Sequence, residues 1–143
     1  GQEFTIPELA QSIVLTRMSM PSTSMPERET LDHFGRTGAT LAIHSAVRNV
    51  REIDRQLVPH YGADCPVVVG YRIGWPDQMI IRGTLSDIRK KIRKEKITRT
   101  AMIMVGPALA ASHDFVDRAL YDPKIPHVLR PVTGIDLVED HNT

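Results

Sequence analysis

Short apolar runs alternate along the chain with segments in which apolar residues recur at helical spacing. The runs are rich in β-branched residues and are bounded by Gly, Pro or polar residues, a pattern typical of β-strands. They predict strands at residues 12–16, 40–44, 66–71, 78–82 and 100–105. Because the turn Trp75-Pro76-Asp77 separates the third run from the fourth, we expect these two strands to form an antiparallel hairpin.

Two helices are expected in the first half of the chain. Pro26 is followed by acidic residues, which favours a helix start there and a helix that ends near Gly35. A second helix is expected to begin at Ser45, because apolar residues recur at near-helical spacing after it. Pro59 and Gly62 are expected to stop that helix.

A third helix is expected after the hairpin, with Thr84 as its N-cap and Asp87 as an acidic variant of the capping box. Ile88 and Ile92 lie on its inner face. A weaker helical pattern follows at residues 108–120, and the segment 122–143 is an irregular tail with a Pro-rich start.

The order of these elements is β-α-β-α-β-β-α-β. Helical crossovers favour parallel neighbours, whereas the hairpin adds an antiparallel pair. We therefore predict an α/β fold of three α/β/α layers around a mixed, mostly parallel five-stranded sheet. Residues 1–121 are expected to form one domain.

The composition excludes several classes of protein. The chain has 143 residues and a formal net charge of +1, so its total charge does not indicate a polyanionic partner. Its apolar runs are too short to span a bilayer, and its six histidines lack the spacing of metal ligands on a helix. With Cys65 as the single cysteine, these features predict a soluble cytoplasmic protein without a metal site.

The basic run 89–96 is the one feature that suggests nucleic acid. We favour a structural interpretation, in which the run is the solvated face of the third helix, because no aromatic residues are interleaved for base stacking. The sequence also lacks a Gly-rich phosphate-binding motif and a Gly-x-Ser-x-Gly nucleophile motif. Partners are therefore expected to include neither nucleic acid nor a membrane.

Four segments carry a more specific signal, at residues 38–47, 70–78, 82–88 and 101–106. In their residues, order and spacing, these segments resemble the C-terminal domain of the tetrapyrrole methylases. Pro26-Glu27-Arg28-Glu29 and the Trp75-Pro76 pair resemble in particular the precorrin-4 methyltransferases, the subfamily that methylates carbon 11 of the corrin precursor in cobalamin biosynthesis.

This resemblance implies a methyltransferase that binds S-adenosylmethionine in a cleft between two α/β domains and acts on an acidic tetrapyrrole, a precorrin. The chain would be the C-terminal half, without the N-terminal domain and its glycine-rich loop, and a homodimer is compatible with the resemblance. An rRNA or diphthamide-pathway methylase, and a non-enzymatic basic binding module, stay open as alternatives.

The family pattern can be carried over to the ends of three strands. It implies that the cofactor is bound at Ser45, Ala46, Ile73, Gly74, Gly106 and Pro107. Arg17, at the end of the first strand, is a candidate for binding a carboxylate of the substrate. No catalytic residue is expected in this half, because methyl transfer from a sulfonium depends on alignment more than on acid–base chemistry.

Overall fold

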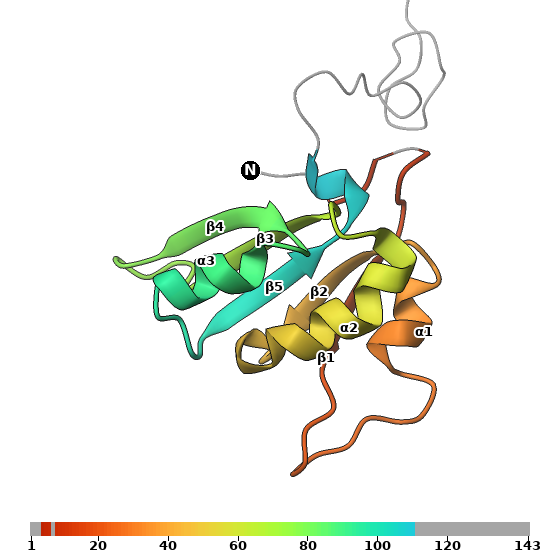
Figure 1. Ribbon diagram of the computed structural model, residues 1–143, viewed down its shortest axis with the longest axis horizontal. Coiled ribbons are helices and arrows are strands. Elements are labelled where there is room, and N and C mark those ends of the chain that lie inside the picture. Colours follow the sequence, from red (N-terminus) through yellow and green to blue (C-terminus); the bar gives the residue numbers. More distant parts are fainter. Residues whose placement is uncertain (1–3, 7, 111–143) are drawn as a thin grey trace, which may run out of the picture.

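A computed structural model describes residues 4–6 and 8–110 of the chain (Figure 1). All five predicted strands are present, and strands and α-helices follow one another in the predicted order. The elements are β1 (Ile13–Arg17), α1 (Leu31–Gly35), β2 (Thr40–His44), η1 (Val47–Asn49), α2 (Val50–Tyr61), β3 (Pro66–Tyr71), β4 (Met79–Thr84), α3 (Ile88–Lys94), β5 (Ala101–Val105) and η2 (Pro107–Ala110). The tail at 122–143 and most of the weak helix at 108–120 lie outside the described residues.

The sheet is mixed, but the prediction that it is mostly parallel is wrong. Its strand order is β1-β2-β5-β3-β4, and only β1 and β2 pair in parallel. The crossovers through α1 and α2 do keep β1, β2 and β3 pointing in one direction, as expected. However, the last strand, β5, lies between β2 and β3 and runs against both, so two expected parallel contacts are replaced by antiparallel ones.

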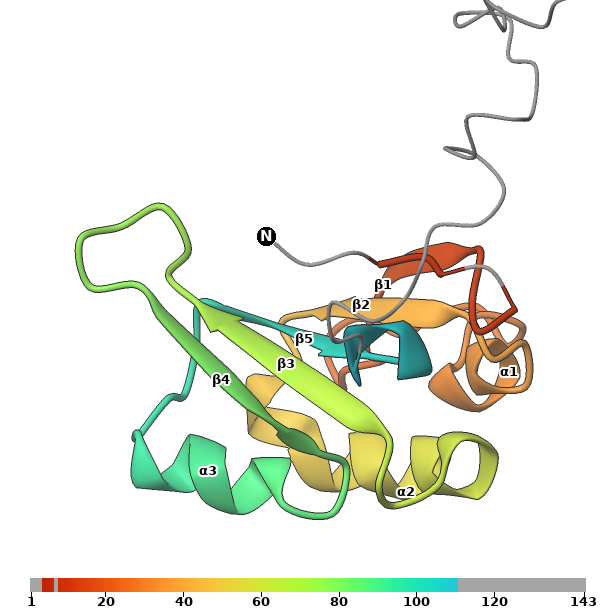
Figure 2. The ribbon, with the colours of Figure 1, turned by 90° about the horizontal axis from the view of Figure 1, so that it is seen from above.

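The described residues form two layers, not the three that were predicted. Figure 2 shows α2 and α3 on the same side of the sheet, and α1 packs against α2. The opposite face carries residues 4–6 and 8–10 and the short helix η2, which meet in a small apolar cluster of Ile6, Ala10 and Ala108. Within the described residues, much of that second face has no helical layer.

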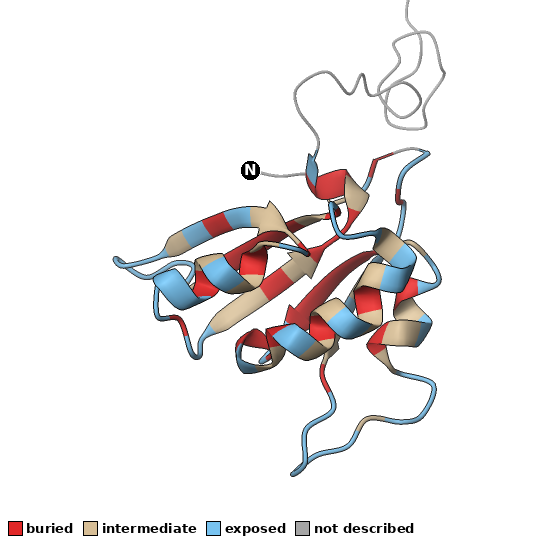
Figure 3. Cartoon of the chain, in the orientation of Figure 1, coloured by how far each residue is buried: buried red, intermediate tan, exposed pale blue. Residues whose placement is uncertain are grey.

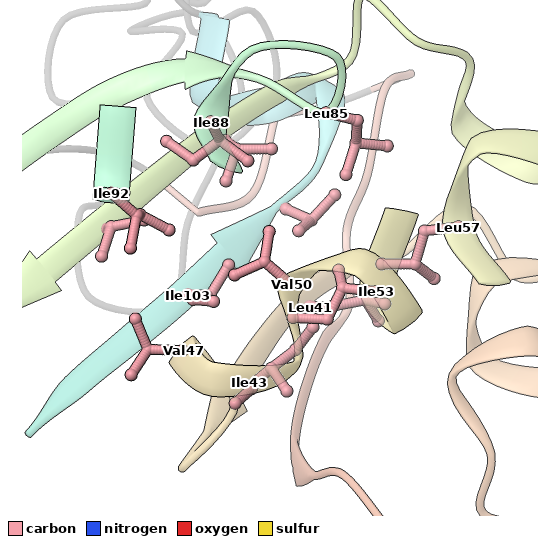
Figure 4. Close-up of a cluster of buried hydrophobic side chains, with 14 of the residues drawn as sticks. Leu41, Ile43, Val47, Val50, Ile53, Leu57, Leu85, Ile88, Ile92 and Ile103 are labelled. Carbon is pink, nitrogen blue, oxygen red and sulfur yellow. The ribbon is translucent and has the colours of Figure 1, made fainter. Parts of the chain in front are cut away.

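The main core lies between the sheet and its helices (Figure 4). Alternate residues of each strand point into it, which is why Val67 and Val69 of β3 are almost completely buried. Helix α2 contributes Ile53 and Leu57, and the exposed residues of the helices lie on their outer sides (Figure 3). The core thus accounts for one face of every strand and leaves the other face for a different role.

The first two helices begin later than predicted. At residues 26–29 the chain makes a turn, and α1 begins at Leu31 because the Thr30 hydroxyl accepts a hydrogen bond from the His33 N–H (3.2 Å). Ser45 does not start a helix, since its backbone is left-handed with a φ of 55°. Helix α2 also continues through Pro59 to Tyr61 before Gly62 ends it.

The expected N-cap at Thr84 is also wrong in its main part. Thr84 is the last residue of β4, and its hydroxyl pairs with that of Ser86 (2.8 Å). Only the reciprocal half of the capping box forms, in which the Thr84 N–H donates to the Asp87 carboxylate (2.8 Å). Asp87 also pairs with Lys91 (2.7 Å), and Gly83 leaves the space that this carboxylate occupies. The connection between β4 and α3 is therefore organised around one acidic side chain.

Candidate functional site

The open face of the sheet holds a groove of about 650 Å³. The pairing of β2, β5, β3 and β4 places His44, Met102, Gly70 and Ile80 in one row across it. The neighbouring row contains Ala42, Met104, Val68 and Arg82. The residues that line the groove are Phe4, His44, Ser45, Val68, Gly70, Arg72, Ile73, Trp75, Ile80, Arg82, Thr100, Ala101, Met102, Met104 and Leu109.

Three residues at one edge of this groove have a left-handed backbone. Ser45 follows β2, Arg72 follows β3, and Thr100 precedes β5, with φ angles of 55°, 46° and 57°. Because β5 runs against both of its neighbours, these three positions meet at the same edge of the sheet, and the Arg72 N–H donates to the Thr100 carbonyl (3.0 Å). Such a backbone is costly for residues other than glycine and is concentrated at functional sites.

Arg72 is held from two sides at this edge. Its Nε lies 3.1 Å from Asp77 Oδ1, and its guanidinium carbon lies 4.3 Å from the centroid of the Trp75 ring. An ion pair and a cation–π contact together restrict the orientation of a side chain that is otherwise flexible. Arg72 and Trp75 both line the groove, so the pair forms a fixed part of its wall.

The lining combines an apolar floor with positive charge. The floor is made of Val68, Met102 and Met104, while Arg72 and Arg82 bring positive charge. Among the described residues that line the groove there is no Asp or Glu. This arrangement suits a ligand with an extended apolar body and negatively charged groups.

The structure brings together two of the predicted cofactor positions. Ser45 and Ile73 both line the groove at the edge described above, and Ile73 lies over Gly70, where a Cβ would approach its Cγ1 to 3.0 Å. Gly74 is next to them in the hairpin turn, with a φ of 87° and its N–H donating to Gln78 Oε1 (2.9 Å). Ala46 differs, because its side chain is fully buried in the main core and only its backbone could contact a ligand.

The other predicted cofactor pair lies elsewhere. Gly106 and Pro107 follow β5, and since β5 runs against β2 and β3, they lie at the opposite edge from Ser45 and Ile73. A Cβ on Gly106 would lie 3.1 Å from the Thr40 Cα, so the glycine allows two backbones to approach closely. Pro107 begins η2, which reaches the groove through Leu109.

Arg17 is engaged in a structural role. Its guanidinium donates to the carbonyl oxygens of Met18 (3.3 Å), Thr23 (3.1 Å) and Ser24 (3.3 Å). It thereby holds the loop that follows β1, and it does not belong to the lining of the groove. The register of β1 and β2 does pair Arg17 with His44, so the two positions are neighbours at the same edge of the sheet.

Several residues of the groove were missed at the level of the sequence. Met102 and Met104 alternate in β5 with core residues, so both faces of that strand are apolar, and this pattern indicates that the second face is covered as well. Arg72 and Trp75 are three residues apart within a turn, a spacing that carries no recognised signal by itself. Their contact depends on the left-handed backbone at Arg72, which no local sequence pattern predicts.

The remaining chemical candidates are structural. Ile88 and Ile92 are buried against the sheet, which supports the interpretation of the basic run as the outer face of α3. No cluster of His, Cys, Asp or Glu in the described part of the chain could hold a metal ion. Cys65 is buried, and burial raises the pKa of its thiol to about 11, so it is an unreactive thiol. None of the described helices is long and apolar enough to cross a membrane.

Comparison with known proteins identifies the family. The pattern of the tetrapyrrole (corrin/porphyrin) methylases matches residues 1–89, and the chain belongs to this family. A precorrin-4 C(11)-methyltransferase from Sinorhizobium sp is 53% identical over 123 residues, which are 86% of this chain and 48% of that protein. Its counterpart from Pseudomonas aeruginosa is 48% identical, over 92% of this chain and 52% of that protein. The chain thus spans about half the length of the curated relatives it matches.

Solved structures agree with the fold. The chain matches a cobalt-precorrin-4 methyltransferase of cobalamin biosynthesis with a TM-score of 0.72 and 34% identity, over 76% of this chain and 45% of that one. A uroporphyrin-III C-methyltransferase from Thermus thermophilus, solved with S-adenosylhomocysteine, matches with a TM-score of 0.61 and 17% identity, over 76% and 48% of the two chains. The second likeness shows a shared fold only.

Proposed function

We propose that this chain supplies about half of a precorrin-4 C(11)-methyltransferase, which transfers a methyl group from S-adenosylmethionine to carbon 11 of precorrin-4. The observation that carries the proposal is the identity of 53% and 48% to two enzymes of that name, across nearly the whole chain. We further propose, from the resemblance of its motifs, that the chain is the C-terminal half of that enzyme.

The groove on the open face fits the half of a cleft that this role requires. Its apolar lining suits the adenosine of the cofactor and the macrocycle of the substrate, and its arginines suit their carboxylates. We propose that Ser45, the backbone of Ala46, and Ile73 with Gly74 form one wall for the cofactor. Gly106 and Pro107 lie at the opposite ends of the strands from that wall. We propose that they affect the cofactor indirectly, by shaping the far end of the groove.

The residues of this chain would contribute alignment and exclusion of water. S-adenosylmethionine supplies a methyl group that is already activated, so the protein needs mainly to hold the acceptor carbon in line with it. The absence of acidic residues from the described lining is consistent with this division of tasks. Arg17 remains a proposed partner for a substrate carboxylate, on the condition that it releases the loop carbonyls it now holds.

A chimeric enzyme tests the proposal. The segment of the Sinorhizobium sp relative that matches this chain would be replaced by the chain itself, and transfer of labelled methyl from S-adenosylmethionine to precorrin-4 would be measured. We expect methylation at carbon 11, identified by NMR of the product. A folded chimera that binds S-adenosylhomocysteine but methylates another position, or another tetrapyrrole in preference, would refute the assignment, and the parent enzyme serves as the control.

A further inference from the structure

We infer that Arg72 is a preorganised receptor for a ligand carboxylate, held in place for that purpose by Asp77 and Trp75. This inference rests on the proposed function. It deepens that function by naming the residue that recognises the acidic groups of what the groove binds. Neither the motif resemblance nor the comparisons assign a role to these three residues.

Two neighbours orient Arg72. Its Nε forms an ion pair with Asp77 Oδ1 at 3.1 Å, and its guanidinium carbon lies over the Trp75 ring, 4.3 Å from the centroid. The two terminal guanidinium nitrogens, Nη1 and Nη2, form no hydrogen bond with any of the described residues. An arginine fixed in this way presents two parallel N–H donors, which match the two oxygens of a carboxylate.

The backbone of Arg72 also indicates that its side chain is used. Arg72 adopts a φ of 46°, a conformation that is unfavourable for a residue with a Cβ relative to glycine. Glycine already occupies such a conformation two residues on, at Gly74, so the turn itself does not need an arginine. The presence of a large charged side chain in a position that suits glycine indicates that the side chain is used.

The surroundings of Arg72 support the same inference. Arg72 lines a groove whose floor is apolar and whose described lining contains no Asp or Glu, since its partner Asp77 lies outside that lining. Asp77 is 57% exposed in its side chain, so it orients the guanidinium from the solvent side without closing the groove. A carboxylate bound here would form a charge-assisted pair with a guanidinium that already rests on an indole ring.

The carboxylate has two chemical sources, the acidic side chains of the tetrapyrrole and the amino-acid end of the cofactor. Both would be tested in the chimeric enzyme, by calorimetric binding of uroporphyrin, a polycarboxylate tetrapyrrole, and of S-adenosylhomocysteine. We expect Arg72→Gly to raise the dissociation constant of one of these ligands at least tenfold. This variant keeps the turn, because glycine accepts the local backbone without strain.

The pattern of binding separates the possible outcomes. Loss confined to uroporphyrin assigns the tetrapyrrole, and loss confined to S-adenosylhomocysteine assigns the cofactor. Unchanged binding of both ligands by a folded Arg72→Gly enzyme overturns the inference, even if the parent chimera methylates precorrin-4. If the parent chimera binds both ligands without methylating precorrin-4, the proposed function fails. The binding test with Arg72→Gly then still shows whether Arg72 binds a ligand carboxylate.

Two further variants separate recognition from structure. Asp77→Asn keeps a polar side chain of the same size beside Arg72 but removes its charge, whereas Asp77→Ala removes both, so the alanine variant should weaken binding of the same ligand more than the asparagine variant does. Equal effects of both variants would contradict an orienting role for the carboxylate oxygen. Arg51→Gly, at an exposed position of α2 on the other side of the molecule, is the matched control and should leave both dissociation constants unchanged.

Discussion

Gly83→Ala is expected to lower the free energy of unfolding by about 2 kcal/mol, although it adds only a methyl group. A Cβ at this position would lie 2.3 Å from Asp87 Oδ1 and 3.2 Å from Lys91 Nζ. Both are ends of flexible side chains, so the clash would be relieved by rotation of the Asp87 carboxylate. The loss of stability therefore comes from the two interactions of the Asp87 carboxylate, with the Thr84 N–H and with Lys91.

The magnitude follows from two interactions. The hydrogen bond from the Thr84 N–H to the charged carboxylate is worth about 1.5–3 kcal/mol. The ion pair with Lys91 is partly exposed on both sides and adds about 0–1 kcal/mol. Replacement of a strand glycine by alanine returns about 0.5–1 kcal/mol, since the unfolded chain loses freedom. The net loss is about 2 kcal/mol.

Urea denaturation followed by circular dichroism would measure this loss, and a double-mutant cycle tests its cause. If rotation of the Asp87 carboxylate is responsible, Gly83→Ala should cost less than about 0.5 kcal/mol in an Asp87→Ala background. The same loss in both backgrounds would show that the carboxylate is not the group displaced. If Gly83→Ala left the free energy of unfolding unchanged in both backgrounds, the proposed close contact would be refuted.

Three other predictions concern groups outside this connection. Burial raises the pKa of Asp54, opposed by Arg89, and its Oδ1 has no hydrogen-bond partner among the described residues. Burial makes ionisation of Asp54 cost more in the folded than in the unfolded chain, so Asp54→Asn should be more stable than the parent at pH 7, with a gap that narrows as the pH is lowered toward the unfolded-state pKa of about 4. Ala46→Trp should lower the midpoint of thermal denaturation, because Ala46 is fully buried in the core and a larger side chain would overpack it. A loss of ligand binding in this variant would therefore reflect unfolding. The chain alone should show no micromolar binding of S-adenosylhomocysteine in calorimetry, because half a cleft buries too little of it.

The local structure was largely predictable from the sequence, whereas the arrangement of the strands was not. Runs such as Thr40–His44 and Pro66–Tyr71 are strands because of their own residues, and their bounds agree with the prediction. The position of β5 between β2 and β3 depends on which faces pack together across the whole chain. Local patterns contain no such information, and the sheet was therefore predicted with the wrong neighbours.

The site was predictable to the same extent. Ser45 and Ile73 were expected at one edge because β2 and β3 are joined by a helical crossover, and the structure places both on the groove. Gly106 lies at the far edge because its position depends on the direction of β5. Arg72 was missed because its fixed place in the wall of the groove depends on a backbone angle and on contacts with Trp75 and Asp77, which form only when the turn is folded.

The placement of the three described α-helices on one face of the sheet (Figure 2) has an evolutionary consequence. Residues that stabilise the fold and residues that line the groove alternate along the same strands, so a mutation on one face leaves the packing of the other nearly unchanged. Drift on the groove side can then change ligand preference at little cost to folding. The likeness to a solved structure at 17% identity shows that the fold itself tolerates extensive change of sequence.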